Sequence, residues 1–336
     1  MATSSGTVGA TSIDATTIIE HSFRRCGKLA STVSSELQLA ARENLFFLLS
    51  DLANRGLSLW CVQKHVIGVV GYQTTYTLPV GTVDINSCSY RLKTDLTGTT
   101  ISGTGWQGLN LGSAAVVNTV SVVFSAATSA NLVVESSADL GVTWSFRSAL
   151  NSGTAVAAGV AICADVDNTA SVQYWRVRDT SGVLASVVQL TFSNSPSDLP
   201  MDKFSNDVYA GLPNKTYSVA AGSRSLQYWF DKQINPQVWI WPLSQVSTDQ
   251  IVVWTQSHIQ DVGSLSNLVN IPQRWHQAVI YMLAELNAAE LPSGELPEGR
   301  LEWLGQKAQE HLLQAEDSES DGSPIRIAPR IRGYSR

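Results

Sequence analysis

Apolar side chains recur every three or four residues near the start of the chain, which is the spacing of amphipathic helices. Residues 16–29 place Ile19, Phe23 and Cys26 on one helical face. Residues 35–56 carry two apolar faces, one made of Leu37, Ala41, Leu45, Leu48 and Leu52 and the other of Phe46, Leu49 and Ala53. A helix that is apolar on two sides is predicted to lie between two neighbours.

The helical spacing returns near the end of the chain. Pro272 suits the first turn of a helix, and it is followed at helical spacing by Trp275, Val279, Met282, Leu286 and Ala289. After a break at 291–299, a last helix is indicated by Leu301, Leu304, Ala308, Leu312 and Ala315. These apolar faces are too large to leave in water, so we predict that helices from both chain ends pack as one bundle.

Residues 60–93 and 226–259 follow a different period. They alternate apolar and polar side chains, are rich in Val, Tyr, Thr and Trp, and are interrupted by turn residues, so they predict antiparallel strands. The stretch between them, 97–198, is dense in Ser, Ala, Val, Thr and Gly and has no lysine. Its short alternating runs are separated by turns at intervals of about 8–12 residues, which is typical of an antiparallel sandwich.

The predicted fold class is α+β, with a helical bundle from both chain ends, a small antiparallel β domain and an inserted, jelly-roll-like antiparallel β-sandwich. The predicted segments are 1–57 (N-terminal helices), 58–96 (first half of the β domain), 97–198 (inserted sandwich), 199–264 (second half of the β domain), 265–317 (C-terminal helices) and 318–336 (extended tail).

Composition restricts the function further. The chain has 336 residues, a net charge of −6 and only 15% charged residues, which argues against a protein that binds nucleic acid through phosphate contacts.

Four cysteines lie far apart with no CxxC pair, so we expect reduced thiols. The N-terminus lacks the pattern of a signal peptide, and no apolar run approaches the roughly 18 residues of a membrane span. We therefore expect assembly in the cytoplasm and no membrane contact.

No catalytic or metal-binding motif stands out. The five histidines fall in no HExxH or HxH spacing, and there is no GxSxG, P-loop or GxGxxG motif. The sequence DVDN at 165–168 faintly resembles a calcium loop but lacks the following Gly and the later Glu, so a polar turn is the favoured interpretation. Glu135 and Asp139 are the nearest candidates for a glycan hydrolase pair. We predict no enzyme activity, metal or cofactor.

Tryptophan is unusually frequent, with ten residues. Trp229, Trp239, Trp241 and Trp254 gather in the second β segment, and Trp144, Tyr174 and Trp175 lie in the inserted segment. Two interpretations apply to both groups. The first is a stacking platform for sugars or bases, and the second is a set of large side chains that fill a core and a subunit interface. The second interpretation is favoured. The run SVQYWRVRDTSG at 171–182 resembles a strand of jelly-roll sandwiches of the carbohydrate-binding type, a likeness of fold that does not imply sugar binding.

The chain ends in SPIRIAPRIRGYSR at 323–336, which contains four arginines, two prolines, three isoleucines and no acid. The prolines disfavour helix, so this tail is predicted to be extended. Its isoleucines could fill pockets as an added strand, and its arginines could pair with carboxylates. A disordered basic tail and a tail that touches DNA phosphates are the alternatives.

Four stretches together resemble the head-to-tail adaptor of short-tailed bacteriophages, also called tail tubular protein A or the portal-bound tail accessory factor. They are TIIEHSFRRCGKL at 17–29, LQLAARENLFFLLSDLANRGLSLW at 37–60, QVWIWPLSQVSTDQIVVWTQSHI at 237–259 with LVNIPQRWHQAVIYMLAELNAAEL at 268–291, and SPIRIAPRIRGY at 323–334. The resemblance covers roughly 12–95 and 200–336; the segment 97–198 departs from the compact family pattern.

The resemblance implies a structural virion protein of the phage tail or neck. It would form a homo-oligomeric ring, expected to be a dodecamer, below the portal protein. The ring would extend the channel through which genomic DNA passes without sequence-specific binding, and would carry the tail nozzle and fibre or spike proteins. The residues implied to bind the portal are Pro324, Ile325, Arg326, Ile327, Pro329, Arg330, Ile331, Arg332 and Tyr334. The bundle or oligomer face would comprise Leu45, Leu48, Leu52, Trp275, Val279 and Met282.

The main alternative is a phage tail protein that binds a carbohydrate or a receptor through the inserted sandwich. It predicts exposed aromatic side chains on 97–198 and measurable glycan binding.

Overall fold

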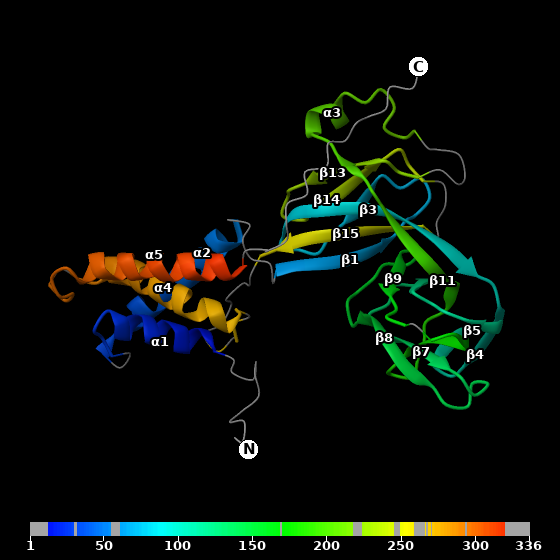
Figure 1. The fold of residues 1–336 in the computed structure, drawn as a ribbon, viewed down its shortest axis with the longest axis horizontal. Coiled ribbons are helices and arrows are strands. Elements are labelled where there is room, and N and C mark those ends of the chain that lie inside the picture. Colours follow the sequence, from blue (N-terminus) through cyan, green and yellow to red (C-terminus); the bar gives the residue numbers. More distant parts are fainter. Residues whose placement is uncertain are drawn as a thin grey trace. The chain divides into compact units, whose positions relative to one another are not determined.

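The chain folds into two compact units (Figure 1). The structure, a computed structural model, describes residues 13–29, 32–54, 61–168, 170–217, 224–244, 249–258, 266, 268–269, 271–292 and 294–319. The helical unit combines Met1–Cys61 with His258–Arg336, and the β unit comprises Val62–Ser257.

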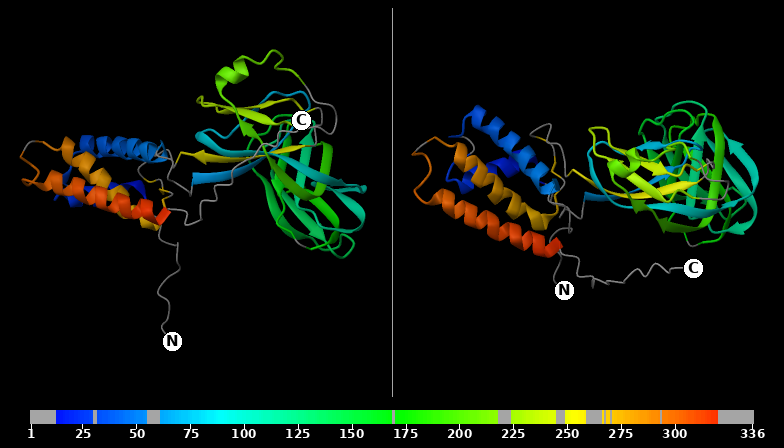
Figure 2. Two further views of the ribbon diagram at one scale, coloured as in Figure 1. Left: turned by 45° about the horizontal axis from the view of Figure 1, so that its top comes forward. Right: turned by 90° about the horizontal axis from the view of Figure 1, so that it is seen from above.

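Helices from both ends of the chain make up the helical unit. They are α1 (Ala15–Arg25), α2 (Ser35–Asn54), the 3₁₀-helix η3 (Gln273–Trp275), α4 (His276–Glu290) and α5 (Arg300–Glu319), and they lie alongside one another in all views (Figures 1 and 2). The carboxylate of Asp14 caps α1, because its Oδ1 accepts a 2.8 Å hydrogen bond from the backbone N–H of Thr17. Asp14 also pairs with Leu268 in a short β-bridge, which joins the two chain ends.

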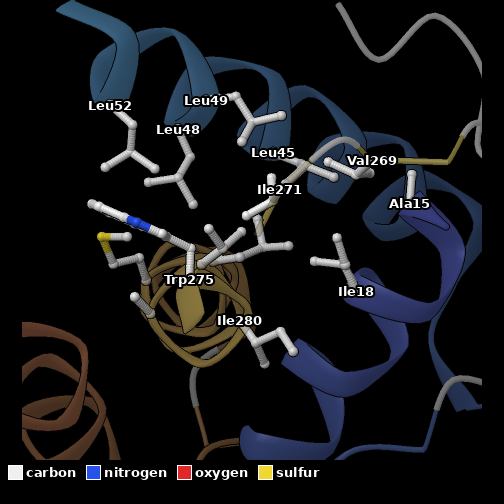
Figure 3. Close-up of a cluster of buried hydrophobic side chains, with 14 of the residues drawn as sticks. Ala15, Ile18, Leu45, Leu48, Leu49, Leu52, Val269, Ile271, Trp275 and Ile280 are labelled. Atoms are coloured by element: carbon white, nitrogen blue, oxygen red, sulfur yellow. The ribbon is translucent and has the colours of Figure 1, made fainter. Parts of the chain in front are cut away.

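The core of the helical unit lies between α1, α2 and α4. Leucines of α2 point toward Trp275 and Ile271 (Figure 3), and all of these side chains are buried. Each large apolar side chain that is fully removed from water in this way stabilises the unit by roughly 1.5–3 kcal/mol.

The β unit contains three sheets whose strands pair almost entirely in antiparallel fashion. A closed barrel has the order β1-β15-β3-β11-β6-β9, a five-stranded sheet the order β4-β5-β10-β7-β8 and a four-stranded sheet the order β12-β13-β14-β2. The strands of the barrel are β1 (Val62–Gly68), β3 (Thr82–Leu96), β6 (Thr119–Phe124), β9 (Ala161–Asp165), β11 (Val187–Pro200) and β15 (Gln250–Ser257). The others are β2 (Thr75–Thr77), β4 (Thr99–Gly103), β5 (Trp106–Ala115), β7 (Asn131–Ser137), β8 (Ser145–Ser152), β10 (Val172–Asp179), β12 (Asp202–Lys203), β13 (Gln227–Asp231) and β14 (Gln237–Trp241); the short helix α3 (Asn206–Ala210) lies between β12 and β13.

Two separate apolar cores flank the barrel. The first joins β1, β3 and β15 to the four-stranded sheet and contains Tyr90, Ile251 and Val253. The second joins β6, β9 and β11 to the five-stranded sheet, and all of its buried residues lie between Leu109 and Phe192. The predicted insert therefore has a core of its own, although its strands are continuous with the barrel.

The interior of the barrel contains a layer of buried polar side chains. Successive side chains of a strand point to opposite faces, so the positions that alternate with the core residues face inward. Among these positions are Arg91, Thr119, Ser121, Ser193 and Gln250, all of them buried. Thr119 Oγ1 donates a 3.0 Å hydrogen bond to Gln250 Oε1, and Arg91 pairs with Asp165 and Asp198. The polar layer thus joins the two halves of the β unit by hydrogen bonds and ion pairs.

The predicted fold class is wrong. The described part of the chain is mostly β, with 41% of its residues in strands and 27% in helices, and it contains a six-stranded barrel that was not predicted. The prediction divided the chain where its composition changes, at 97 and 198. The strand β11 crosses the second of these points and β3 ends next to the first, and the two strands pair with each other from Phe192 opposite Leu96 to Pro200 opposite Ser89. A hydrogen-bonded ladder depends on backbone register, which a change in composition does not reveal.

Candidate binding site on the five-stranded sheet

The outer face of the five-stranded sheet carries aromatic and charged side chains in register. Along β10, Trp175 is buried in the core, so its neighbours in the strand, including Arg176, face outward. Arg176 stands opposite Glu135 on β7, and Arg178 stands opposite Trp106 on β5. The pairing of three strands therefore brings residues distant in sequence onto one surface.

Arg176 packs against two tryptophan rings that also contact each other. Its guanidinium carbon is 4.1 Å from the ring centroid of Trp144 and 5.1 Å from that of Trp106, and the two ring centroids are 5.6 Å apart. These distances are those of cation–π contacts. Gly108, opposite Arg176 on β5, makes room for this packing, because an added Cβ would lie 2.1 Å from the carbonyl oxygen of Trp175 and 2.8 Å from the Cβ of Arg176.

Glu135 holds both arginines of this face. Its Oε2 accepts from Arg176 Nε at 2.7 Å, and its Oε1 accepts from Arg178 Nη2 at 2.7 Å. Burial opposes ionisation of the carboxyl group, but the hydrogen bonds from Arg178 and Arg176 outweigh this effect and lower the pKa of Glu135. Glu135 is therefore a fixed carboxylate at neutral pH, and it orients two guanidinium groups.

The turn before β8 positions Trp144. Asp139 accepts hydrogen bonds from the hydroxyl of Ser137 at 2.6 Å and from the backbone N–H of Thr143 at 2.8 Å. These bonds lower the pKa of Asp139 to about 2. Trp144 Nε1 donates a 3.0 Å hydrogen bond to the carbonyl of Gly141, which fixes the edge of the indole ring. The turn thus presents the ring to the sheet face from one side.

Exposed apolar side chains surround this cluster. Phe146 stands opposite Glu135 in the β7–β8 register and is 61% exposed, and Leu140 and Val142 of the turn are also exposed. We call Trp106, Trp144, Phe146, Glu135, Arg176 and Arg178 the aromatic–arginine face. It offers aromatic rings and a fixed guanidinium group side by side, an arrangement that can stack a flat or ring-shaped ligand and bond its polar edge.

A second aromatic cluster covers the outer face of the four-stranded sheet. Trp229 and Trp239 are a cross-strand pair on β13 and β14, and Tyr209 of α3 packs on both rings at centroid distances of 5.5 and 5.3 Å. Lys215 lies 5.7 Å from the ring centroid of Tyr209. Tyr209 is buried, so α3 covers much of this cluster. Trp241 contacts Tyr217, while Trp254 is exposed on β15 beside Lys64.

The residues predicted for the adaptor function fall into two groups. The predicted portal-binding residues, from Pro324 to Tyr334, lie outside the described residues. The predicted bundle or oligomer face, Leu45, Leu48, Leu52, Trp275, Val279 and Met282, is buried in the core of the chain's own helical unit.

The sequence candidates for metal binding and hydrolysis have other partners. Asp165 pairs with Lys64 and Arg91, and the side chain of Asn168 bonds to the backbone of Ala170, as in a polar turn. Within the described part of the chain, no group of three or more His, Cys, Asp or Glu side chains is placed to hold a metal ion. Glu135 and Asp139 both have lowered pKa values, so neither carries the proton that a general acid needs at neutral pH.

None of the four cysteines forms a disulfide bond. None of the helices in the described ranges has the length and apolar character needed to cross a membrane.

The sequence contained a signal for part of this site. In 172–179, Trp175 and Val177 share one phase of the alternation and Arg176 and Arg178 the other, so one tryptophan could be assigned to the core and both arginines to the surface. The partnership of Arg176 with Glu135 joins residues 41 positions apart and required the register of β7 and β10.

No family model and no curated protein matches the chain. Solved structures similar to part of it include the CBM62 module of Xyl5A from Clostridium thermocellum, with 15% identity and a TM-score of 0.23 over 40% of this chain and 97% of that one. Another is CBM32-1 from a family 31 glycoside hydrolase of Clostridium perfringens, with 11% identity and a TM-score of 0.22 over 40% and 94%. A third is chitosan-binding module 1 of a chitosanase/glucanase from Paenibacillus sp. IK-5, with 20% identity and a TM-score of 0.18 over 38% and 92%.

Proposed function

We propose that this chain is a carbohydrate-binding protein and that the aromatic–arginine face holds the sugar. The observation that carries the proposal is the packing of Arg176 against both Trp106 and Trp144, with Glu135 fixing the guanidinium group. A pyranose ring has an apolar face of C–H groups and an edge of hydroxyls. The exposed aromatic carbon of the aromatic–arginine face suits the C–H groups of the sugar, and the rigid charged groups beside it suit the hydroxyls.

The site is built on strands rather than on a long loop, which favours a fixed geometry. Rigid binding groups lose little conformational entropy when a ligand arrives, so a shallow face can still bind with useful affinity. Glu135 and its arginines are already paired in the free protein, and the turn at 137–144 is closed by its own hydrogen bonds.

The test is glycan binding by the full-length protein, first on a glycan array and then by calorimetric titration of the best ligand. Phe146→Ala and Trp144→Ala should each weaken binding at least severalfold, because each removes an aromatic surface from the face. Phe47→Ala is the matched control, since it removes an exposed aromatic ring from α2 in the other unit. If the wild-type protein binds no glycan, or if Phe146→Ala and Phe47→Ala bind equally to the wild type, the proposal is wrong.

A second candidate function is the ring-forming head-to-tail adaptor of short-tailed phages, a virion protein of the tail or neck. The observation that favours it is the exposed side of α2. Phe46 and Phe47 lie there with ring centroids 5.7 Å apart, and Leu39 is exposed on the same helix, while the other side of α2 is buried in the core. Exposed aromatic side chains next to a packed face are typical of a surface that a partner covers. For this candidate, the partner on α2 is a second copy of the chain.

The adaptor proposal is tested by the mass of the purified protein, alone and with a phage portal protein. A ring of about twelve copies is expected, and Phe46→Ser with Phe47→Ser should dissociate it. The chain truncated after Gly322 should still form the ring but should not sediment with the portal. A monomer under all conditions, with no portal binding, would exclude the adaptor function and leave the sugar-binding proposal untouched.

A further inference from the structure

We infer that the sugar bound by the aromatic–arginine face is acidic, and that Arg178 pairs with its carboxylate or sulfate group. This inference rests on the proposed carbohydrate-binding function and specifies the chemical class of the ligand. It is carried by the distribution of accessible charge on the face.

The acidic side chains near the face are already occupied by donors of the protein. Glu135 accepts from Arg176 through Oε2 and from Arg178 mainly through Oε1, and its side chain is only 7% exposed. Asp139 uses both of its carboxylate oxygens for Thr143 in its own turn. Asp179, the residue after Arg178, is buried and bonded to Ser181. Glu135 and Asp179 are buried, and the exposed Asp139 is already bonded through both oxygens, so these acids offer few acceptors to the hydroxyl groups of a neutral sugar.

The accessible charge is the guanidinium group of Arg178. Its side chain is 34% exposed, against 13% for Arg176, which the two tryptophan rings cover. The hydrogen bonds from Arg178 to Glu135 come from Nε and Nη2, so they do not use Nη1. A guanidinium group that is fixed on one edge and open on another is prepared for a second anion.

The placement of Arg178 beside an aromatic ring fixes where that anion would lie. Arg178 stands directly opposite Trp106 in the β5–β10 register. A sugar ring stacked on the exposed aromatic carbon of the face would therefore bring a substituent at its edge to the guanidinium group. A neutral sugar would leave this charge without a new partner, whereas a uronate, sialate or sulfated sugar would pair with it. The chain as a whole is acidic, with a net charge of −6, so general attraction to anions does not explain such a preference.

The test uses an array that pairs each uronate-, sialate- or sulfate-bearing glycan with its neutral counterpart, followed by titration of the best-bound pair. The wild-type protein should bind the acidic member about tenfold more tightly, and this preference should shrink as salt is raised. Arg178→Gln should lower the affinity for the acidic glycan to that for the neutral one, so that the tenfold preference is lost. Arg178→Lys keeps the charge but loses the planar fork, so it should keep only part of the preference.

The outcomes separate the two proposals. If the wild-type protein binds neutral glycans as well as acidic ones, the inference is overturned while the carbohydrate-binding function stands. If Arg178→Gln keeps the full acidic preference and the native melting temperature, Arg178 is not the anion partner and the inference also fails. Binding to no glycan overturns the proposed function itself. Preference for sulfated but not carboxylated partners, or the reverse, identifies the source of the anion.

Discussion

Arg91 on β3 donates to both carboxylate oxygens of Asp198 on β11, with Nε–Oδ1 at 2.6 Å and Nη2–Oδ2 at 2.9 Å. The same guanidinium group also pairs with Asp165 on β9. Arg91 is almost fully buried in the polar layer inside the barrel, and it connects strands that belong to the two different apolar cores. The ion pairs of Arg91 therefore add to the backbone pairing that joins the two halves of the β unit.

We predict that Arg91→Met destabilises the β unit by roughly 2–3 kcal/mol, because it removes the ion-pair partner of Asp198 and leaves Asp165 with Lys64 alone. The effect should be smaller than for a fully buried pair, since the side chains of Asp165 and Asp198 are more than a third exposed and water screens their charges. Thermal unfolding followed by circular dichroism measures the loss. Lys307→Met, which breaks an exposed pair with Glu310 on α5, is the control and should change stability little. Equal effects of the two substitutions would contradict the role given to Arg91.

The ion pairs of Glu135 should make the β unit sensitive to acid. The pKa of Glu135 in the folded protein is lowered from its ordinary value of 4.5, so its stabilising effect is present above that value and is lost as the pH falls through the folded pKa. Glu135→Gln should lower stability at pH 7 by roughly 2 kcal/mol and flatten the pH dependence of the melting temperature below pH 4.5. Parallel pH profiles for wild type and variant, separated by a constant amount, would show that Glu135 does not contribute through its charge.

Two glycines should respond in opposite directions to the same substitution. An added Cβ at Gly108 meets the backbone carbonyl of Trp175 at 2.1 Å, and backbone cannot move aside easily, so Gly108→Ala should destabilise the β unit by at least about 1–3 kcal/mol. At Gly305 in α5, the nearest atom is the flexible carboxyl end of Glu285 at 3.0 Å. Gly305→Ala should therefore stabilise the helical unit by up to about 1 kcal/mol through helix propensity. Melting curves of the two variants test both signs.

Buried thiols should resist alkylation in the native protein. Burial raises the pKa of Cys26 to about 11 and that of Cys88 to about 12, so at pH 8 both remain neutral thiols rather than reactive thiolates. Their neutral state favours the fold below the ordinary thiol pKa of 9.0, and this contribution declines as the pH rises toward the folded values. Mass spectrometry after iodoacetamide treatment should find both residues unmodified in buffer and modified in urea. Rapid labelling in buffer would indicate that these cores open readily.

The sequence predicted the parts of the fold that depend on local spacing. The helical period at 35–56 corresponds to α2, and the residues that share its predicted face, such as Leu45 and Leu52, are buried. Helical spacing is set by neighbouring residues, so it can be recognised without the rest of the chain. The closure of the barrel could not be recognised in this way, because Ile67 on β1 meets Ile162 on β9 across a long stretch of chain.

The candidate site also contains residues whose role could be predicted from local spacing and residues whose role could not. Trp144 and Trp175 had the same two interpretations at first, as a binding platform or as core. Trp175 is fully buried in the second apolar core, whereas Trp144 remains partly exposed beside Arg176. The burial of Trp175 follows from its phase in the strand, which the alternation of the sequence predicts. The exposure of Trp144 follows from the fold of the 137–144 turn, which depends on the hydrogen bonds of Asp139 and could not be predicted.

The continuous pairing of β3 with β11 has a mechanical consequence. The segment that carries the aromatic–arginine face begins after β3 and ends at β11, two strands that lie side by side and are hydrogen-bonded to each other from Ser89–Pro200 to Leu96–Phe192. β3 is also paired with β15 over most of its length. A pull on a ligand bound to the face would therefore stretch two strands together and load the β3–β15 bonds in shear, with many bonds sharing the force. A single flexible linker would instead extend first and transmit little force, so the paired strands β3 and β11 form a stiff connection.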